Sequence, residues 1–446
     1  MSDRASKSRC GPAAIALLLL ATAPVAAQRL DDRPEGLPAG PFLVEPYVRF
    51  TYENDDNVFR RNGLVEINTF NTVVSDNIAT VWGGAKASLP FRMSLLEFSA
   101  ELSRFEYQKT TVPQDFTRDF QATGTFNFAT GDTVALSERF LQGLSQIQAT
   151  VGGDGGEETF SGRPFDLNEL ELEISRAMPG RAGYSVRIRR IDLNWDAFPV
   201  PTGAFDYRGW NSSVEFRKPI PGRRWLIFSF NGRRLDHFDA DYATAPEPEA
   251  PFGVPFRQEK FDSAQVGVRG FQSRGSPFFV QIGYGRFDYE FVEGLVDSQG
   301  QPVESSGFRG LVGAGRWRVP IGGRTSLDIS GQRRVLPSNL NTHYVNNDLR
   351  VHFYREWLRY STVGIDVRWS GNRYGDLIFD EGANVPDGCK QLRKDRRTLA
   401  EAYVSWLPFV RTTFRMALSL DDRNSNCPLF EYDSTRLTAG VSYGWD

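Results

Sequence analysis

The chain has 446 residues, of which 24% are charged, and a formal net charge of −3 at pH 7. This length could hold two or three ordinary domains, but no shift in composition marks a linker, so we expect one large architecture. Lys and Arg are not in clustered excess, which excludes the charge pattern of a nucleic-acid-binding protein.

The first residues have the features of an export signal. Basic residues precede an apolar run from Ala13 to Ala21, and Val25-Ala26-Ala27 supplies the small residues of a cleavage site before Gln28. We therefore expect residues 1–27 to be a signal peptide and residues 28–44 to be a short periplasmic segment.

After Gln28 the main signal is an alternation of apolar and polar residues, which places one set of side chains on each face of a strand. The segments 96–103, 169–174 and 414–421 show it most clearly. No stretch approaches the roughly 18 uninterrupted apolar residues that a spanning helix needs. We expect strands with one face toward lipid and the other toward water, as in transmembrane barrels.

This alternation predicts about eighteen strands. In chain order they cover Tyr47–Asn54, Ser75–Ser88, Met93–Gln108, Asp115–Ala129, Thr133–Leu141, Asp166–Ala177, Ala182–Trp195, Phe205–Arg217, Arg224–His237, Arg257–Phe271, Phe278–Phe291, Ser306–Arg318, Thr325–Val335, Tyr344–Glu356, Ser361–Gly371, Arg397–Trp406, Arg411–Asp421 and Ser434–Trp445.

The connections between these strands alternate in length. Short segments of turn-forming residues, such as Leu89-Pro90-Phe91, alternate with long polar ones, such as Gly143–Phe165 and Asn372–Lys394. Outer-membrane barrels pair short periplasmic turns with long external loops. The sequence thus predicts an all-β fold, a transmembrane antiparallel up-and-down β-barrel over residues 45–446. The alternative is a soluble two-sheet sandwich.

The segment Glu45–Arg60, which reads EPYVRFTYENDDNVFR, resembles the first strand and following loop of the β-barrel porin 2 family of bacterial outer-membrane proteins. Asp55-Asp56-Asn57 carries the match, and Ser75-Asp76-Asn77, Met93–Gln108 and Leu437–Trp445 are similar to the same family. The family includes outer-membrane proteins of exopolysaccharide operons, so the resemblance implies a part in moving polysaccharide to the cell surface. One departure is Asp446 at the end, where such barrels usually carry an aromatic residue.

The lining of the predicted barrel is charged. A barrel of about eighteen strands leaves an aqueous channel unless loops fill it, so transport is the default function. Inward arginines and carboxylates nearly balance, which predicts no strong ion selectivity and favours a weakly charged solute or a sugar chain. The alternative is that these charges only pair across strands and stiffen the wall. The predicted lumen-lining residues are Glu169, Glu171, Glu173, Arg187, Arg189, Arg217, Arg233, Arg350, Arg368 and Arg415.

One hairpin allows a prediction of register. A turn centred on Met178-Pro179-Gly180 sets Glu171 opposite Arg187 and Glu169 opposite Arg189. Opposite charges at such cross-strand positions stabilise a sheet, so we expect these two ion pairs.

The sequence gives little support for a catalytic or a metal site. Only His237, His343 and His352 could act as near-neutral bases, and acyl transfer needs one beside a serine and an orienting partner. His352 has Asp366 and Ser370 near it on the next predicted strand. Acidic segments at 154–158 and 376–381 contain ligands that calcium accepts, but such loops are commonly just solvated. We expect no enzyme, metal or cofactor, with an outer-membrane hydrolase as the least favoured alternative.

The cysteines predict one disulfide. Cys10 precedes the apolar run of the signal, so it is not a lipoprotein cysteine, and cleavage leaves Cys389 and Cys427. Export exposes both to an oxidising compartment, and they fall in successive predicted external loops. The alternative is two free buried thiols.

Together these patterns predict a porin-like channel in the outer membrane of a Gram-negative bacterium, with exopolysaccharide export implied by the resemblance. The alternative is a structural or assembly barrel whose lumen is filled. Expected partners are outer-membrane lipid, the barrel assembly machinery and, from the resemblance, polysaccharide and components of an export system. No nucleic acid partner is expected.

Overall fold

The computed structural model describes residues 37–57, 75–109, 116–144, 164–177, 181–195, 207–237, 256–273, 276–291, 307–337, 343–358, 360–375, 392–427 and 430–444. Within these ranges no helix is long and apolar enough to cross a membrane. The strands are β1 (Leu37–Ala39), β2 (Phe42–Asp55), β3 (Asp76–Phe91), β4 (Ser94–Tyr107), β5 (Phe116–Asn127), β6 (Asp132–Leu144), β7 (Pro164–Arg176), β8 (Gly183–Trp195), β9 (Tyr207–Ile220), β10 (Arg224–His237), β11 (Phe256–Ser273), β12 (Ser276–Phe291), β13 (Phe308–Pro320), β14 (Thr325–Pro337), β15 (His343–Leu358), β16 (Ser361–Tyr374), β17 (Lys394–Phe409), β18 (Thr412–Ser425) and β19 (Tyr432–Gly444).

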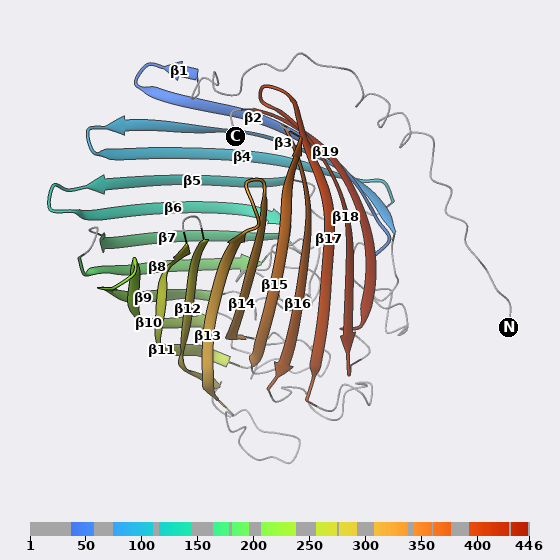
Figure 1. Ribbon diagram of the computed structural model, residues 1–446. Coiled ribbons are helices and arrows are strands. Elements are labelled where there is room, and N and C mark those ends of the chain that lie inside the picture. The colour runs from blue at the N-terminus through green and yellow to red at the C-terminus, as the bar shows by residue number, and fades with distance from the viewer. Residues whose placement is uncertain are drawn as a thin grey trace.

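Eighteen of these strands, β2 to β19, form one closed antiparallel barrel (Figure 1). Each strand pairs with the next along the chain, and β19 pairs back to β2, with Tyr443 opposite Val48. The short strand β1 pairs with the start of β2. The predicted fold is therefore confirmed, and its first strand begins at Phe42, slightly ahead of the predicted barrel start at Glu45.

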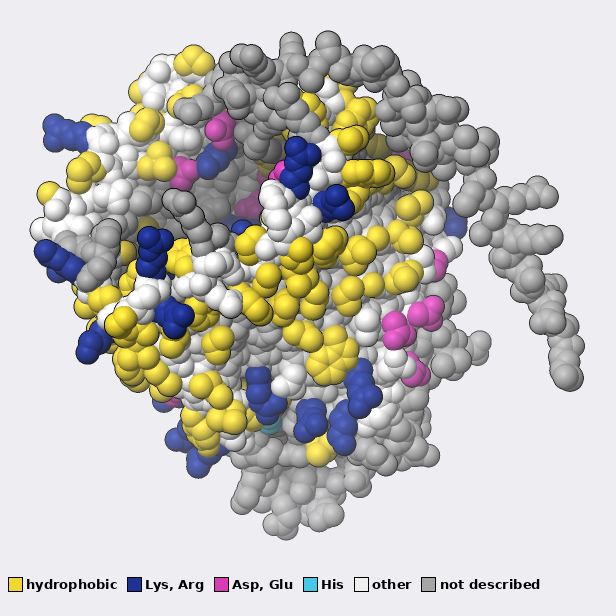
Figure 2. Space-filling view, viewed as in Figure 1, with side chains coloured by type: hydrophobic (Ala, Val, Ile, Leu, Met, Phe, Trp, Pro, Cys, Tyr) yellow, Lys and Arg dark blue, Asp and Glu magenta, His cyan; other side chains and the backbone are white. Residues whose placement is uncertain are grey.

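The two faces of the barrel wall differ as the alternation predicts. On β4, Phe98 and Leu102 are exposed on the outer face, whereas Glu101 on the inner face accepts a hydrogen bond from the Tyr47 hydroxyl. Among the described residues, every barrel strand except β14 exposes at least one such large apolar side chain. They form a band across the middle of the wall, and Lys and Arg gather toward both ends (Figure 2). Lipid is the environment that stabilises an apolar surface of this extent.

The short connections lie at the end of the barrel where β19 finishes (Figure 1). Three of them contain a glycine with positive φ, namely Gly131 at 83°, Gly222 at 86° and Gly322 at 83°. Glycine adopts this left-handed conformation without a Cβ clash, which lets two strands reverse over few residues. The longer connections, at the opposite end, lie mostly outside the described residues.

At that opposite end, the residues that carry the family resemblance join the first and last barrel strands. Asp55 is buried, and its Oδ1 accepts hydrogen bonds at 2.9 Å from the backbone N–H of Asn57 and from the hydroxyl of Ser434 on β19. Asp56 accepts a 2.7 Å hydrogen bond from the backbone N–H of Thr435. This segment therefore fastens the closure of the barrel.

Candidate functional site

The candidate site begins where β13 and β14 part. These two strands pair only from Pro320 opposite Ser326 to Gly313 opposite Arg333. Beyond that point β14 still pairs with β15, as far as Pro337, and the start of β13 pairs with β12 alone. Residues 334–337 of β14 therefore have no partner on β13, whereas β15 stays paired with β16 from Tyr344 onward. We call residues 334–337 and 343–346 the distal hairpin.

The distal hairpin packs on the inner face of β12 and β13. The His343 ring lies 5.9 Å from the Phe308 ring, centroid to centroid, and its Nδ1 shares a 2.5 Å hydrogen bond with the Tyr289 hydroxyl. Val335 and Val345 of the hairpin are buried, at 3% and 8% exposed. Apolar packing and this hydrogen bond thus hold the hairpin inside the barrel, where it narrows the lumen.

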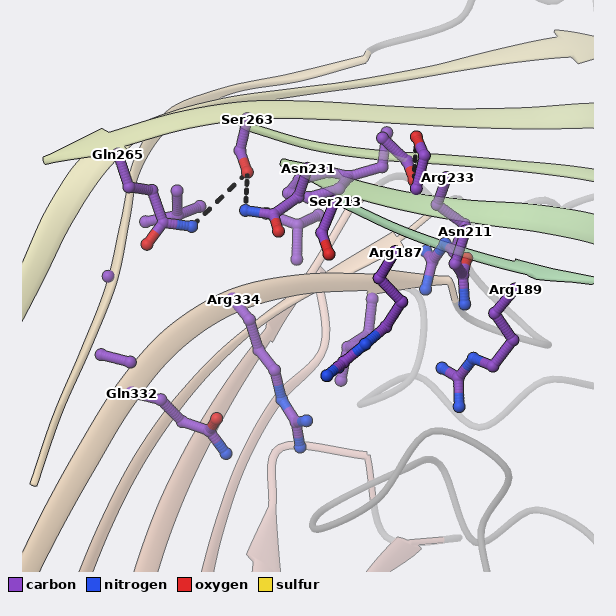
Figure 3. A pocket seen from close by; sticks show the side chains of 18 of the residues that line it. Arg187, Arg189, Asn211, Ser213, Asn231, Arg233, Ser263, Gln265, Gln332 and Arg334 are labelled. Carbon is purple, nitrogen blue, oxygen red and sulfur yellow. Dashed lines mark hydrogen bonds between the residues drawn. The ribbon is translucent and has the colours of Figure 1, made fainter. Parts of the chain in front are cut away.

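A cavity of about 520 Å³ lies between the hairpin strand β14 and the inner face of β7–β11. Arg187, Arg189 and Arg233 line it on one side, and Gln332 and Arg334 line it on the other. Figure 3 shows Arg187, Arg189 and Arg334 extending into the space between the two walls. We call this cavity the lumenal pocket.

Paired charges border the lumenal pocket on β7 and β8. Arg187 contacts Glu173 at 2.7 Å and Glu171 at 3.2 Å, and Arg189 contacts Glu169 at 3.2 Å. The five side chains form a chain of alternating charges along the inner wall, so much of their field cancels locally.

The predicted register of this hairpin is wrong by two positions. The structure sets Arg187 opposite Glu173 and Arg189 opposite Glu171, and the two predicted ion pairs form diagonally instead. The cause is the turn, which is centred one residue beyond Pro179 because β7 continues to Arg176 opposite Tyr184. Moving a turn centre by one residue shifts every pair by two.

Arg233 on β10 is the least satisfied cation of the lumenal pocket. Its Nε and Nη2 are buried and have no hydrogen-bond partner among the described residues. Its Cζ lies 5.8 Å from the centroid of the Phe287 ring, which supplies only a cation–π contact. A buried donor without an acceptor costs about 1–3 kcal/mol. An anionic group in the pocket would therefore find donors that are already desolvated.

Uncharged polar side chains complete the lining. Asn231 Nδ2 and Gln265 Nε2 both donate to Ser263 Oγ, at 3.3 and 3.5 Å (Figure 3). Asn211, Ser213 and Gln332 also face the cavity. Sequence reasoning missed these residues because it followed charge. Their inward phase is the signal that would have found them, and on β9 and β10 they share a strand with the predicted Arg217 and Arg233.

Four of the predicted lumen-lining arginines lie on the inner face but do not line the lumenal pocket. Each pairs with a carboxylate: Arg217 with Glu215, Arg350 with Asp366, Arg368 with Asp348 and Arg415 with Glu401. Arg350, Arg368 and Arg415 pair across strands, which stiffens the wall, whereas Arg217 pairs with a residue of its own strand, β9. An ion pair thus accounts for the charge of each of the four.

The candidates for other chemistry are placed as follows. His352 lies opposite Asp366, but its Nε2 is 3.0 Å from the Tyr403 hydroxyl, and its ring stacks on Tyr354 and Tyr403. In the part of the chain that the structure describes, no group of three or more His, Cys, Asp or Glu residues is arranged to hold a metal. The two acidic segments considered for calcium lie outside the described residues.

Cys427 is disulfide-bonded and 1% exposed. Its backbone N–H donates a 3.0 Å hydrogen bond to Ser425 Oγ, just beyond the end of β18. Cys389 lies outside the described residues, so the pairing of these two cysteines stays a prediction.

No family model and no curated protein matches this chain. Among solved structures it is similar to the outer membrane protein OpdK from Pseudomonas aeruginosa, with 11% identity, a TM-score of 0.47, and 90% of this chain and 97% of that chain covered. It is also similar to OccK2 from the same organism in complex with glucuronate, with 10% identity, a TM-score of 0.47, and 90% and 98% covered. A third is a BenF-like porin from Pseudomonas fluorescens Pf-5, with 10% identity, a TM-score of 0.48, and 91% and 99% covered.

Proposed function

We infer that this chain is a porin-like channel of the outer membrane, and that its lumenal pocket binds a small solute that carries both an anionic group and hydroxyl groups. The observation that carries the proposal is the pair of desolvated, unpartnered nitrogens of Arg233 beside the cavity. The apolar outer face and polar inner face of a closed barrel support placement in a membrane.

The charge of the pocket supports an anionic solute. Arg187 and Arg189 are balanced by the glutamates of β7, so Arg233, whose Nε and Nη2 have no hydrogen-bond partner among the described residues, supplies the excess of positive charge. Guanidinium groups bind carboxylates through paired, charge-assisted hydrogen bonds. The balance of charges over the whole lumen predicts weak ion selectivity. The lumenal pocket adds a local preference for anions to that expectation.

The size and the neutral lining support a small hydroxylated solute. A cavity of about 520 Å³ falls in the range of roughly 300–1,000 Å³ that small-molecule sites occupy. The amides and hydroxyls of Asn211, Ser213 and Gln332 can each donate to or accept from a sugar hydroxyl. Sugar acids combine both features in one molecule.

Planar-bilayer recordings of the purified barrel test this proposal. An added hexuronate should block the current in a saturable way, and the uncharged hexose should block it much more weakly. Arg233→Gln should weaken the block by about tenfold, since a hydrogen bond to a charged group contributes about 1.5–3 kcal/mol. The control Arg350→Gln, which removes a lumenal arginine outside the pocket, should change it less than about twofold. Equal block by hexose and hexuronate, or a barrel that passes no current, would contradict the proposal.

Export of an exopolysaccharide is the second candidate. The family resemblance implies it, and the uncharged polar lining of the lumenal pocket favours it, because such side chains bind sugar hydroxyls along a chain. Deleting the gene should then abolish surface polysaccharide, and a variant with Arg233→Gln should restore it. Normal surface polysaccharide in the deletion strain would leave the small-solute channel as the better account.

Residence in the outer membrane is part of the same proposal, together with insertion by the barrel assembly machinery. The chain should fractionate with the outer membrane after loss of residues 1–27, and it should migrate as a compact species on unboiled gels, because a closed sheet has no edge from which to unzip. Recovery as a soluble periplasmic protein would contradict it.

A further inference from the structure

The outer face of β8–β13 carries basic side chains at the boundary of the apolar band. Along these strands, toward the end with the long connections, Ile188, Phe230, Tyr284 and Leu311 are exposed apolar residues. The outward charged residues that follow include one cation on each of the six strands. We call these six the arginine arc: Arg190, Arg208, Arg234, Lys260, Arg286 and Arg309.

Register places cations of the arginine arc directly opposite each other. Arg234 on β10 is the cross-strand partner of Lys260 on β11, and Arg286 on β12 is the partner of Arg309 on β13. Like charges at directly opposed positions destabilise a sheet. At these two junctions, β10 with β11 and β12 with β13, an anion placed between the opposed cations would relieve their repulsion.

Neighbouring carboxylates balance this surface only in part. Arg234 lies 3.9 Å from Asp236, Lys260 lies 3.4 Å from Asp262 and Arg286 lies 2.5 Å from Asp288, each on its own strand. Asp192 on β8 lies 3.8 Å from Arg190 and 2.8 Å from Arg208 on β9. Register also sets Asp262 opposite Arg286 and Asp288 opposite Lys260. The six cations of the arc therefore outnumber these four carboxylates by two. Arg309 makes no ion pair with any residue that the structure describes. The arc side chains of β10, β11 and β12 are 62%, 57% and 54% exposed, so they are available to a ligand outside the barrel.

We propose that the arginine arc binds the phosphate groups of a phosphorylated glycolipid in the external leaflet. This rests on the proposed placement of the barrel in the outer membrane, which puts the edge of the apolar band at the level of lipid headgroups. A phosphate monoester carries up to two negative charges and three acceptor oxygens, and it can accept from guanidinium groups on two strands at once. It thus relieves the repulsion between the opposed cations, and the adjacent apolar band receives the acyl chains. Basic clusters next to a hydrophobic surface are a known basis of headgroup recognition.

The test compares binding of purified full-length barrel, in neutral detergent, to three probes: bisphosphorylated lipid A, the same lipid after enzymatic dephosphorylation, and inorganic phosphate. Native mass spectrometry should show bound bisphosphorylated lipid that survives competition by inorganic phosphate and weakens as salt is raised. The dephosphorylated lipid should bind at least about tenfold more weakly. Equal binding of the two lipids, or complete displacement by inorganic phosphate, would overturn the proposal.

Variants locate the site. The four-fold variant Arg234→Gln, Lys260→Gln, Arg286→Gln and Arg309→Gln should lose at least about tenfold in lipid affinity. Its matched control removes the same charge from outward positions on β4, β5, β16 and β17: Arg104→Gln, Arg118→Gln, Arg373→Gln and Arg396→Gln. An equal loss in both variants would show general charge attraction and would overturn the site.

Conductance measured on the same preparations keeps the two proposals separate. The arc lies on the outer face, so the four-fold variant should retain hexuronate block of the current. If the barrel passes no current, and lipid binding is lost only in the four-fold variant, the channel proposal is contradicted and the phosphate site is supported.

Discussion

The cluster around Asp395 offers a direct test of how the barrel is stabilised at the end with the long connections. The Asp395 carboxylate accepts hydrogen bonds from Arg393 Nη2 at 2.7 Å, Arg423 Nη2 at 2.5 Å and Ser425 Oγ at 2.6 Å. Its own side chain is 1% exposed, and those of Arg393 and Arg423 are 3% and 4% exposed. Asp395→Ala leaves two guanidinium groups buried without their shared carboxylate. Removing one partner from a buried ion pair costs about 3–5 kcal/mol, so we expect a loss in this range.

The matched control is Asp366→Ala. Asp366 also pairs with an arginine across two strands, but that arginine, Arg350, is 52% exposed, and exposed ion pairs contribute only about 0–1 kcal/mol. Urea unfolding of the refolded barrel, followed by tryptophan fluorescence and by the gel shift between folded and unfolded forms, measures both losses. Equal losses for the two variants would refute the argument that burial, rather than the count of ion pairs, sets their contribution.

Three smaller tests address the register, the inner wall and the disulfide. Arg187→Glu should destabilise the barrel by about 0.2–1 kcal/mol, and adding Glu173→Arg should restore it; absence of rescue would mean that the pairing of β7 with β8 is not as described. Gly364→Val should cost about 1–3 kcal/mol, because a Cβ there would lie 2.4 Å from a tyrosine ring atom, whereas Gly83→Val, with nothing within 4 Å, should be nearly neutral. Mass spectrometry of the unreduced chain should find Cys427 in a linked peptide pair, and its free alkylation would contradict the bond.

The strands and their two faces follow from the sequence because both depend on local alternation. Each strand must bury or expose its own side chains with a period of two, and this requirement does not depend on its neighbours. Register depends on the geometry of each turn, and here sequence reasoning fell short. A turn centred one residue later than assumed moved Arg187 from Glu171 to Glu173. Long side chains reached the diagonal partner, so the charges still paired.

The lumenal pocket could not be predicted because it depends on where pairing stops. β13 and β14 part beyond Gly313 and Arg333, but Gly315 on the same strand keeps its partner Gly331, so a glycine alone does not mark the point where pairing stops. Four consecutive residues of the distal hairpin are buried: His343, Tyr344, Val345 and Asn346. Consecutive residues of a strand point to opposite faces, so both faces of the hairpin are covered here, one on the wall side and one on the lumen side. Alternation along β15 assumes a single wall, so it assigns the outward residues of this stretch to lipid.

The residues that carry the family resemblance and those that carry the proposed function lie in different parts of the barrel. The resemblance therefore does not indicate which solute is transported. Asp55 and Asp56 bond to Ser434 and Thr435 on the last strand, so the segment that carries the resemblance closes the barrel. These hydrogen bonds stabilise the closure of a barrel whichever solute it transports. Under the proposed function, substrate choice is set by side chains that a solute can reach, among them the arginines, amides and hydroxyls of β8–β11 and β14 that line the lumenal pocket. Substitutions in the closing segment should therefore change stability without changing selectivity, and those at Arg233 should do the reverse.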